Sequence, residues 1–167
     1  MSHQITAKQH NSKMCFVCGL NNSFGLHASF YELESNQLVA LFTPCDEHQG
    51  YPDRMHGGLA ATILDETIGR SLNINQHEIW GVTVEFNARY KKPVPLGQEL
   101  RVVGRITKEN RRLFEGSGEI LLPDGQIAVE GFGKYIKLPL DEIADFDYEE
   151  QEWKQVPSPE DPKTIDI

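Results

Sequence analysis

The segment HGGLAATILDETIGR, from His56 to Arg70, holds a carboxylate on a face where a helix would normally be apolar. At about 100° per residue, Asp65 shares its face with small residues. None of the neighbours of Asp65 three or four positions away is a cation. Such a carboxylate is either a solvent-exposed helix residue or a residue with a catalytic role. Glu66 precedes Arg70 by four residues, which favours an exposed ion pair.

The beginning of the same segment could bind an anion or a developing oxyanion. Glycines such as Gly57 and Gly58 let a ligand approach the backbone, and a helix has no internal acceptors for its first N–H groups. His56, just ahead, could orient a carbonyl or donate a hydrogen bond. The alternative is a plain joint between a loop and a helix, with a histidine on the surface.

The elements around this segment predict one sheet and one helix. Two short strands, HASFYEL and QLVALFT, precede a helix from Gly57 to about Asn73. Four stretches of alternating polarity follow. The first places Thr83 on one face and, on the opposite face, Val82, Val84, Phe86, Ala88 and Tyr90. Glycines inside the last three stretches indicate bending or a close approach of backbones.

A single apolar helix of about 16 residues has to be covered by the sheet. We therefore predict an α+β hotdog fold, in which a six-stranded, bent antiparallel sheet wraps around one long central helix. Adjacent antiparallel strands need only tight turns, which fits the short connections between these stretches.

Length and charge divide the chain of 167 residues into a body and a tail. Residues 138–167 contain ten acidic residues against two lysines, so most of the formal net charge of −9 lies there. We expect a flexible N-terminus over residues 1–13, one domain over 14–137, and an acidic, partly disordered C-terminal extension over 138–167. The nearly neutral body could bind a small anion and argues against nucleic acid as a partner.

No apolar run approaches the ~20 residues of a membrane-spanning helix, and the N-terminus lacks the apolar stretch of a secretory signal. Cys15, Cys18 and Cys45 do not form a disulfide framework, so a cytoplasmic location is expected.

Cys15 and Cys18 form one CxxC pair, whereas a structural zinc site normally needs four ligands. The spacings of Cys45, His27 and His48 from this pair are not typical of a zinc site. The thioredoxin-like βαβ context of a redox CxxC is also missing. We expect the cysteines to pack in the interior, with no metal.

Several motifs together resemble one family. HGGLAATILDETIG, preceded by HQGYPDRM, is similar to the acyl-CoA thioesterases of the hotdog superfamily, in the phenylacetate-pathway (PaaI-like) branch. There a His-Gly-Gly opens the central helix and an acid follows nine positions after the histidine, as His56 and Asp65 do. CFVCGLNNSFGLHASF and YKKPVPLGQELRVVGRI resemble further parts of the family, so the likeness runs from about Cys15 to Ile136.

The resemblance implies hydrolysis of an acyl-CoA thioester to free acid and coenzyme A. Asp65 would be the general base for water, or a nucleophile that forms an anhydride. The N–H of Gly57 or Gly58 would form the oxyanion hole, with help from His56. The site would lie across the interface of a homodimer, or of a dimer of dimers. No cofactor is expected, because coenzyme A is part of the substrate.

Further residues are candidates for substrate binding. Thr62 shares the helix face of Asp65. Some relatives carry an asparagine six residues before the histidine, where this chain has Gly50, and Gln49 is the nearest amide. Three cationic residues could bind the phosphate groups of coenzyme A: Arg89, Lys91 and Lys92. They could equally be solvated side chains at the end of a strand.

Two other functions fit the same fold. One is an enoyl-CoA hydratase or dehydratase, which also uses an aspartate and a histidine. The other is a non-catalytic acyl-CoA-binding module in which Asp65 is incidental. A fold alone does not separate these functions.

Overall fold

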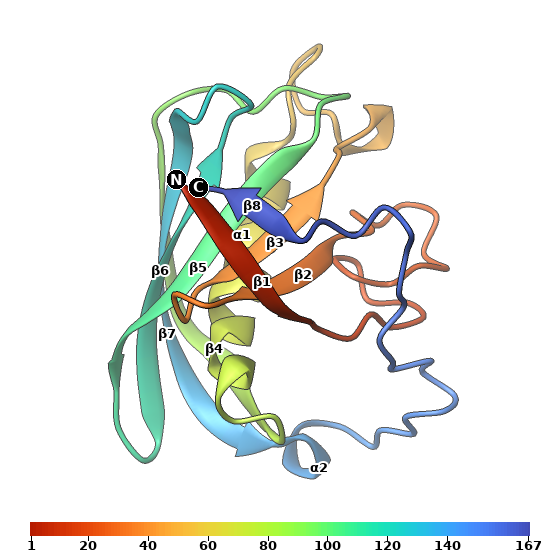
Figure 1. The fold of residues 1–167 in the computed structure, drawn as a ribbon, viewed down its shortest axis with the longest axis vertical. Coiled ribbons are helices and arrows are strands. Elements are labelled where there is room, and N and C mark those ends of the chain that lie inside the picture. Colours follow the sequence, from red (N-terminus) through yellow and green to blue (C-terminus); the bar gives the residue numbers. More distant parts are fainter.

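Eight antiparallel strands form one sheet that wraps around a single long helix in the computed structural model, which describes residues 1–167 (Figure 1). The helix is α1 (Gly57–Arg70), and the strand order in the sheet is β4-β7-β6-β5-β3-β2-β1-β8. The strands are β1 (Ser2–Lys8), β2 (Ser29–Leu33), β3 (Leu38–Phe42), β4 (Ile79–Tyr90), β5 (Leu100–Glu109), β6 (Leu113–Leu121), β7 (Ile127–Pro139) and β8 (Thr164–Asp166). The predicted hotdog fold is confirmed, and β1 and β8 extend the six expected strands at one edge.

Helix α1 is flanked by short turns. The expected helix end near Asn73 falls in a 3-10 turn, η2 (Ser71–Ile74), which continues α1 directly. The other helical pieces are η1 (Asp46–His48) and α2 (Leu140–Ile143). None of the helices has the length and apolar character needed to cross a membrane.

Glycines in the strands allow α1 to lie close against the sheet. A Cβ atom at Gly104 would lie 2.8 Å from the carbonyl oxygen of Thr67, and one at Gly116 would lie 2.5 Å from a methyl group of Ile68. Real Cβ atoms do not approach other atoms this closely, so larger residues would push the helix away. The predicted close approach is therefore confirmed at these positions.

The N-terminus differs from our expectation of a flexible segment. Residues Ser2–Lys8 form β1, which pairs with β2 on one side and with β8 on the other. Beyond β1, the amide group of Asn11 donates to the carbonyl oxygens of Cys18 and Ala28. Backbone hydrogen bonds to these two strands order the segment, and its polar composition did not indicate such pairing.

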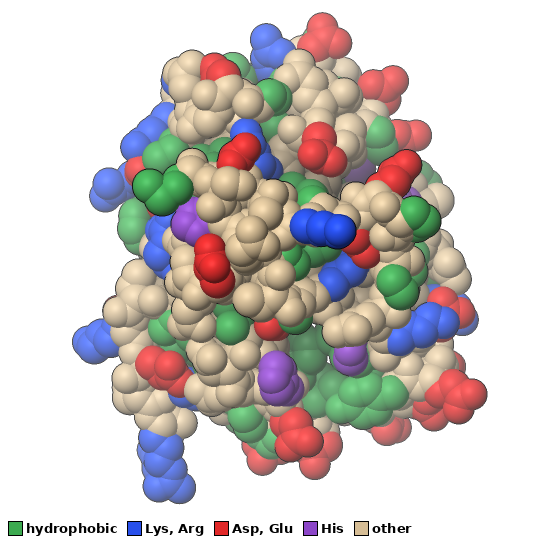
Figure 2. Space-filling view, in the orientation of Figure 1, with side chains coloured by type: hydrophobic (Ala, Val, Ile, Leu, Met, Phe, Trp, Pro, Cys, Tyr) green, Lys and Arg blue, Asp and Glu red, His purple; other side chains and the backbone are tan.

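The acidic C-terminal segment also packs onto the body, where we expected a partly disordered extension. Trp153 packs against the main core cluster, and Ile165 is 6% exposed in a second cluster. The Lys8 ammonium lies 2.6 Å from the Asp161 carboxylate. Acidic side chains gather along the path of this segment, at the lower right of the view in Figure 2. A few apolar anchors therefore order a segment whose average composition indicated disorder.

Strand β4 contains an irregularity that corrects the predicted alternation. Its register against β7 shifts between Thr83 and Glu85, as in a β-bulge. Thr83 and Phe86 both face α1, whereas Val84 is 55% exposed. The prediction that Val82 and Val84 share the inner face with Phe86 was wrong, because an extra residue inverts the alternation.

Candidate active site

Asp65 lies in the middle of α1 and accepts hydrogen bonds from two neutral hydroxyl groups. The Thr83 hydroxyl, from β4, lies 3.0 and 3.2 Å from the two carboxylate oxygens. The Tyr135 hydroxyl, from β7, lies 3.1 Å from Oδ1 and 3.2 Å from the backbone carbonyl oxygen of Asp65. No salt bridge joins Asp65 to a cation.

This environment makes Asp65 a stronger base than an ordinary aspartate. Burial raises the pKa of Asp65, and the nearby Glu66 carboxylate acts in the same direction. The hydrogen bonds from Thr83 and Tyr135 lower the pKa again, but they do not cancel the effect of burial. A half-buried carboxylate without a cation is therefore available to accept a proton.

Glu66 has different surroundings. Its carboxylate lies 2.7 Å from Nε of Arg70, in the ion pair that the spacing predicted. The sequence suggested an exposed pair, but the Arg70 side chain is only 3% exposed. Arg70 is covered because its guanidinium lies between the rings of Phe30 and Trp153, at 4.3 and 5.0 Å from their centres.

His56 caps the start of α1 and determines which N–H group is free there. Its Nδ1 atom accepts a hydrogen bond of 2.9 Å from the Gly58 N–H, so a neutral His56 ring carries its proton on Nε2. No hydrogen bond is made by the Gly57 N–H. Of the two predicted oxyanion donors, Gly57 is thus free, whereas Gly58 is engaged by His56.

A cavity of about 320 Å³ opens beside this helix start. Tyr90 forms one wall and donates a hydrogen bond of 2.6 Å to the carbonyl oxygen of Gly57. Three cationic residues line the same cavity, two from the predicted set and one that the sequence reasoning missed: Lys91, Lys92 and Arg54. The cavity therefore combines positive charge with an open helix start.

The other predicted binding residues lie outside this cavity. Gln49 uses its side-chain carbonyl to accept from the Asp53 N–H, 3.3 Å away, and Arg89 extends over the ring of Phe132. Gly50 is close to the site, since a Cβ atom there would lie 3.0 Å from Cα of His56. Thr62 donates its hydroxyl hydrogen to the Gly58 carbonyl oxygen, 2.9 Å away, one turn back along α1.

Asp65 and Gly57 are too far apart in one chain to act on one carbonyl group. They are separated by eight residues of a continuous helix, or about 12 Å at 1.5 Å per residue. A general base and an oxyanion donor both have to lie within hydrogen-bond reach of the reacting atoms. A single chain therefore holds two separate halves of such a site.

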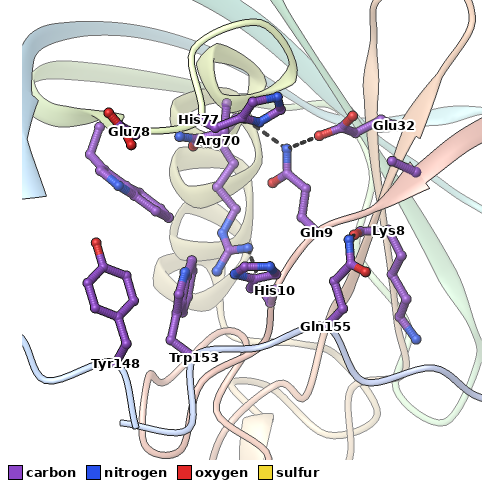
Figure 3. A pocket seen from close by; sticks show the side chains of 13 residues that line it. Lys8, Gln9, His10, Glu32, Arg70, His77, Glu78, Tyr148, Trp153 and Gln155 are labelled. Carbon is purple, nitrogen blue, oxygen red and sulfur yellow. Dashed lines mark hydrogen bonds between the residues drawn. The ribbon is translucent and has the colours of Figure 1, made fainter.

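Other parts of the molecule are less suited to this chemistry. A cavity of about 440 Å³ lies at the opposite end of α1, around Arg70, Trp80 and Trp153, and none of the predicted catalytic residues lines it (Figure 3). One group of potential metal ligands occurs, Cys15, Cys18 and Glu66, but the Arg70 guanidinium lies against Cys18. A positive side chain at that place opposes a metal cation.

The sequence reasoning missed four residues of these sites: Thr83, Tyr135, Tyr90 and Arg54. Thr83 was assigned to the wrong face because the bulge in β4 leaves no clear signal in the sequence. Tyr135 was one apolar position among several in an alternating strand. Arg54 immediately precedes Met55 and His56, so its closeness to the motif was the available signal.

A bent sheet around one helix, with an unpaired carboxylate on that helix and a glycine-rich helix start, defines a class of hotdog proteins. Residues 53–129 match the thioesterase superfamily, and the chain has the hotdog fold of solved thioesterase superfamily proteins.

Relatives agree with this assignment. Acyl-coenzyme A thioesterase THEM4 of Mus musculus is 33% identical over 113 residues, which make up 67% of this chain and 48% of that protein. The chain spans about half the length of the curated relatives it matches. A thioesterase superfamily protein of known structure is 28% identical, with a TM-score of 0.60 over 65% of this chain and 53% of its own.

The likeness to the PaaI branch is one of fold. The PaaI protein of the E. coli phenylacetic acid degradation operon has a TM-score of 0.61 over 68% of this chain and 80% of its own, at 14% identity. At this identity the structure supports the shared hotdog architecture alone.

Proposed function

We propose that this protein hydrolyses acyl-CoA thioesters to a free acid and coenzyme A. Asp65 acts as general base toward water, or as nucleophile toward the thioester carbonyl. The Gly57 N–H stabilises the oxyanion, and His56 assists through the proton on Nε2. The thioesterase THEM4, a relative at 33% identity, supports this choice among the functions possible on the fold.

The environment of Asp65 carries the proposal. Thr83 and Tyr135 hold both carboxylate oxygens with neutral donors, and burial keeps the pKa of Asp65 above that of an ordinary aspartate. A cation in their place would stabilise the carboxylate and weaken it as a base. The arrangement suits a group that accepts a proton from water during the reaction.

The active form is a dimer with two shared sites. The 12 Å or so between Asp65 and Gly57 in one helix is bridged when the partner supplies the other half. Strand β4 is one of the two edge strands of the sheet, and apolar side chains lie exposed on it and on the adjacent β7: Val82, Val84, Phe132 and Ile136. An edge strand with unpaired backbone groups and exposed apolar side chains is well suited to pack against a second copy of the chain.

The cationic cavity beside Gly57 receives the coenzyme A portion. Arg54, Lys91 and Lys92 surround it, and phosphate groups are commonly held by such side chains. Arg89 lies over the ring of Phe132, outside the cavity, and does not belong to this set of phosphate-binding residues.

Steady-state release of coenzyme A from a panel of short-chain, medium-chain and aromatic acyl-CoAs tests the activity. We expect hydrolysis by the natural protein and a large loss in Asp65→Asn. Binding of acyl-CoA without release of coenzyme A would favour a binding module. Addition of water across an enoyl-CoA double bond would favour a hydratase.

Mixing two inactive variants tests the shared site. Asp65→Asn lacks the carboxylate, and Gly57→Pro lacks the N–H donor, so each homodimer should be inactive. Subunit exchange should restore one intact site per mixed dimer, and up to about half of the activity per mixed dimer. Mixtures that remain inactive after proven exchange, or an active monomer, would contradict a site shared between subunits.

A further inference from the structure

Cys15 and Cys18 lie beside Glu66 of α1 and take no part in the proposed hydrolysis. Their sulfur atoms and a carboxylate oxygen of Glu66 all lie within 4.8 Å of one another. A tight turn keeps the two cysteines together, closed by the Gly19 N–H, which donates to the Cys15 carbonyl oxygen at 2.7 Å. A Cβ atom at Gly19 would lie 2.4 Å from that oxygen, so the turn requires glycine there.

The groups around the Cys18 sulfur are ones that stabilise a thiolate. The Arg70 Nη2 group donates a hydrogen bond to Cys18 Sγ, 3.0 Å away, and the Ser12 hydroxyl lies 3.5 Å from the same sulfur. The hydrogen bond with Cys15 and, more weakly, the Arg70 charge lower the pKa of Cys18, against the opposing effect of burial. The pKa of Cys15 is raised, first by that hydrogen bond and then by burial. Cys18 is therefore the sulfur of the pair that loses its proton more readily.

The two cysteines differ in access. Cys15 is half-buried, whereas Cys18 has no exposed surface. Cys15 is therefore the residue of the pair that a reagent in solution can approach, and the Cys18 sulfur lies within 4.8 Å of the Cys15 sulfur. Thiol–disulfide exchange requires a thiolate on the accessible cysteine, and here the neighbouring Cys18 sulfur can take up the proton of Cys15.

We propose that Cys15 and Cys18 form a reversible disulfide by exchange with a low-molecular-weight disulfide such as oxidised glutathione. Cys15 gives its proton to Cys18 and attacks the reagent, which forms a mixed disulfide and releases one glutathione as a thiolate. The released thiolate takes this proton from Cys18. The Cys18 thiolate then attacks the Cys15 sulfur, which forms the internal disulfide and releases the second glutathione as a thiolate. In the sum, two protein thiols are oxidised and one glutathione disulfide is reduced to two thiols.

Arg70 favours this reaction over binding of a metal. Its guanidinium already lies against the ligand group and makes two further bonds, to Glu66 and to the His10 carbonyl oxygen. Figure 3 shows the Arg70 side chain with its guanidinium end beside His10 and Trp153. A divalent cation would have to displace a buried positive charge that is hydrogen-bonded in place.

The variant Cys45→Ser provides the test, because it removes the third cysteine, which lies exposed in another loop. Incubation with oxidised glutathione should remove both remaining thiols and lower the protein mass by two hydrogen atoms. Reduced glutathione in excess should restore both thiols. An unchanged thiol count at every ratio of oxidised to reduced glutathione would overturn the proposal.

Single variants in the Cys45→Ser background separate the two roles. Cys18→Ser should accumulate a mixed disulfide with glutathione on Cys15, since nothing can attack it. Cys15→Ser should form no adduct in its folded state, because Cys18 is inaccessible. Equal labelling of both variants would contradict the assigned roles, and so would one equivalent of bound zinc that protects both thiols.

Arg70→Met should shift the equilibrium with glutathione toward the disulfide, because the reduced form loses the charge that stabilises its thiolate. The shift is about tenfold for each unit by which the pKa of Cys18 rises toward the working pH. If this variant does not fold, Ser12→Ala should give a smaller shift in the same direction. No shift in either folded variant would show that these contacts do not set the redox equilibrium.

Discussion

Two adjacent acidic residues on α1 lie in opposite environments. Asp65 accepts hydrogen bonds from the neutral hydroxyls of Thr83 and Tyr135 and has no cation beside it. Glu66 pairs with the buried Arg70, on the side that also holds the two cysteines. The helix turns by about 100° between them, and this rotation gives each acid different neighbours.

This difference shows how one helix keeps a reactive and a structural carboxylate side by side. Neutral donors orient Asp65 but leave its pKa raised by burial. The Arg70 charge neutralises Glu66 and ties α1 to the N-terminal segment through the His10 carbonyl oxygen. The Asp65 side should therefore control rate, and the Arg70 side should control stability.

Removal of the Asp65 carboxylate should have the largest effect on rate. For Asp65→Asn we expect kcat to fall by about 10²–10⁴, the usual contribution of a general base. The matched variant Glu66→Gln should keep kcat within about threefold, because its carboxylate faces Arg70 and not the reacting groups. Acyl-CoA hydrolysis at saturating substrate measures both, and equal losses would remove the proposed distinction.

Removal of the Arg70 charge should have the largest effect on stability. Arg70→Met leaves Glu66 and the Cys18 sulfur without their buried cation, and we expect unfolding to become easier by about 3–5 kcal/mol. The control Arg111→Met changes an exposed arginine and should stay within about 0.5 kcal/mol. Denaturant unfolding of both variants provides the comparison. A small loss at Arg70 would mean that the buried pair adds little to stability.

The hydroxyl donors should tune the pH dependence of the reaction. Their hydrogen bonds lower the pKa of Asp65, so removing one in Thr83→Val or Tyr135→Phe should raise it further. Because the carboxylate is the active base, activity on the acidic side should fall off at a higher pH, by about 0.5–1 unit. The profile of kcat/KM against pH measures this shift. A shift toward lower pH would contradict the assigned sign.

The smallest effect concerns the stability cost of keeping Asp65 ionised. Burial raises its folded-state pKa above the unfolded value, so its contribution to stability declines as the pH rises through that folded-state pKa. Asparagine does not ionise, and it can still accept hydrogen bonds from Thr83 and Tyr135. We therefore expect the free energy of unfolding of Asp65→Asn at pH 8 to equal that of the natural protein or to exceed it by up to about 1 kcal/mol. A clearly less stable variant would show that the carboxylate serves the fold.

The helix and its two acids were accessible from the sequence because they depend on short-range order. Helical periodicity placed Asp65 among small residues, and the four-residue spacing paired Glu66 with Arg70. The strand glycines likewise predicted close packing. Thr83 was placed on the wrong face, since one extra residue in β4 inverts a pattern of period two.

The termini show the same limit in another way. The polar N-terminus and the acidic C-terminus look disordered by composition, yet β1 and β8 pair with each other and Trp153 covers Arg70. Strands β1 and β8 pair although they lie more than a hundred residues apart in the chain. Average composition carries no record of such contacts.

The sequence by itself determined the fold class, the central helix, the position of Asp65 and the glycine-rich helix start, because local spacing encodes each of them. Only the tertiary structure decided which groups surround Asp65, which N–H at the helix start is free, and that the Arg70 pair is buried. These properties depend on side chains from β4, β7 and the C-terminal segment that meet the helix after folding. Long-range packing therefore assigned different chemical surroundings to two neighbouring acids.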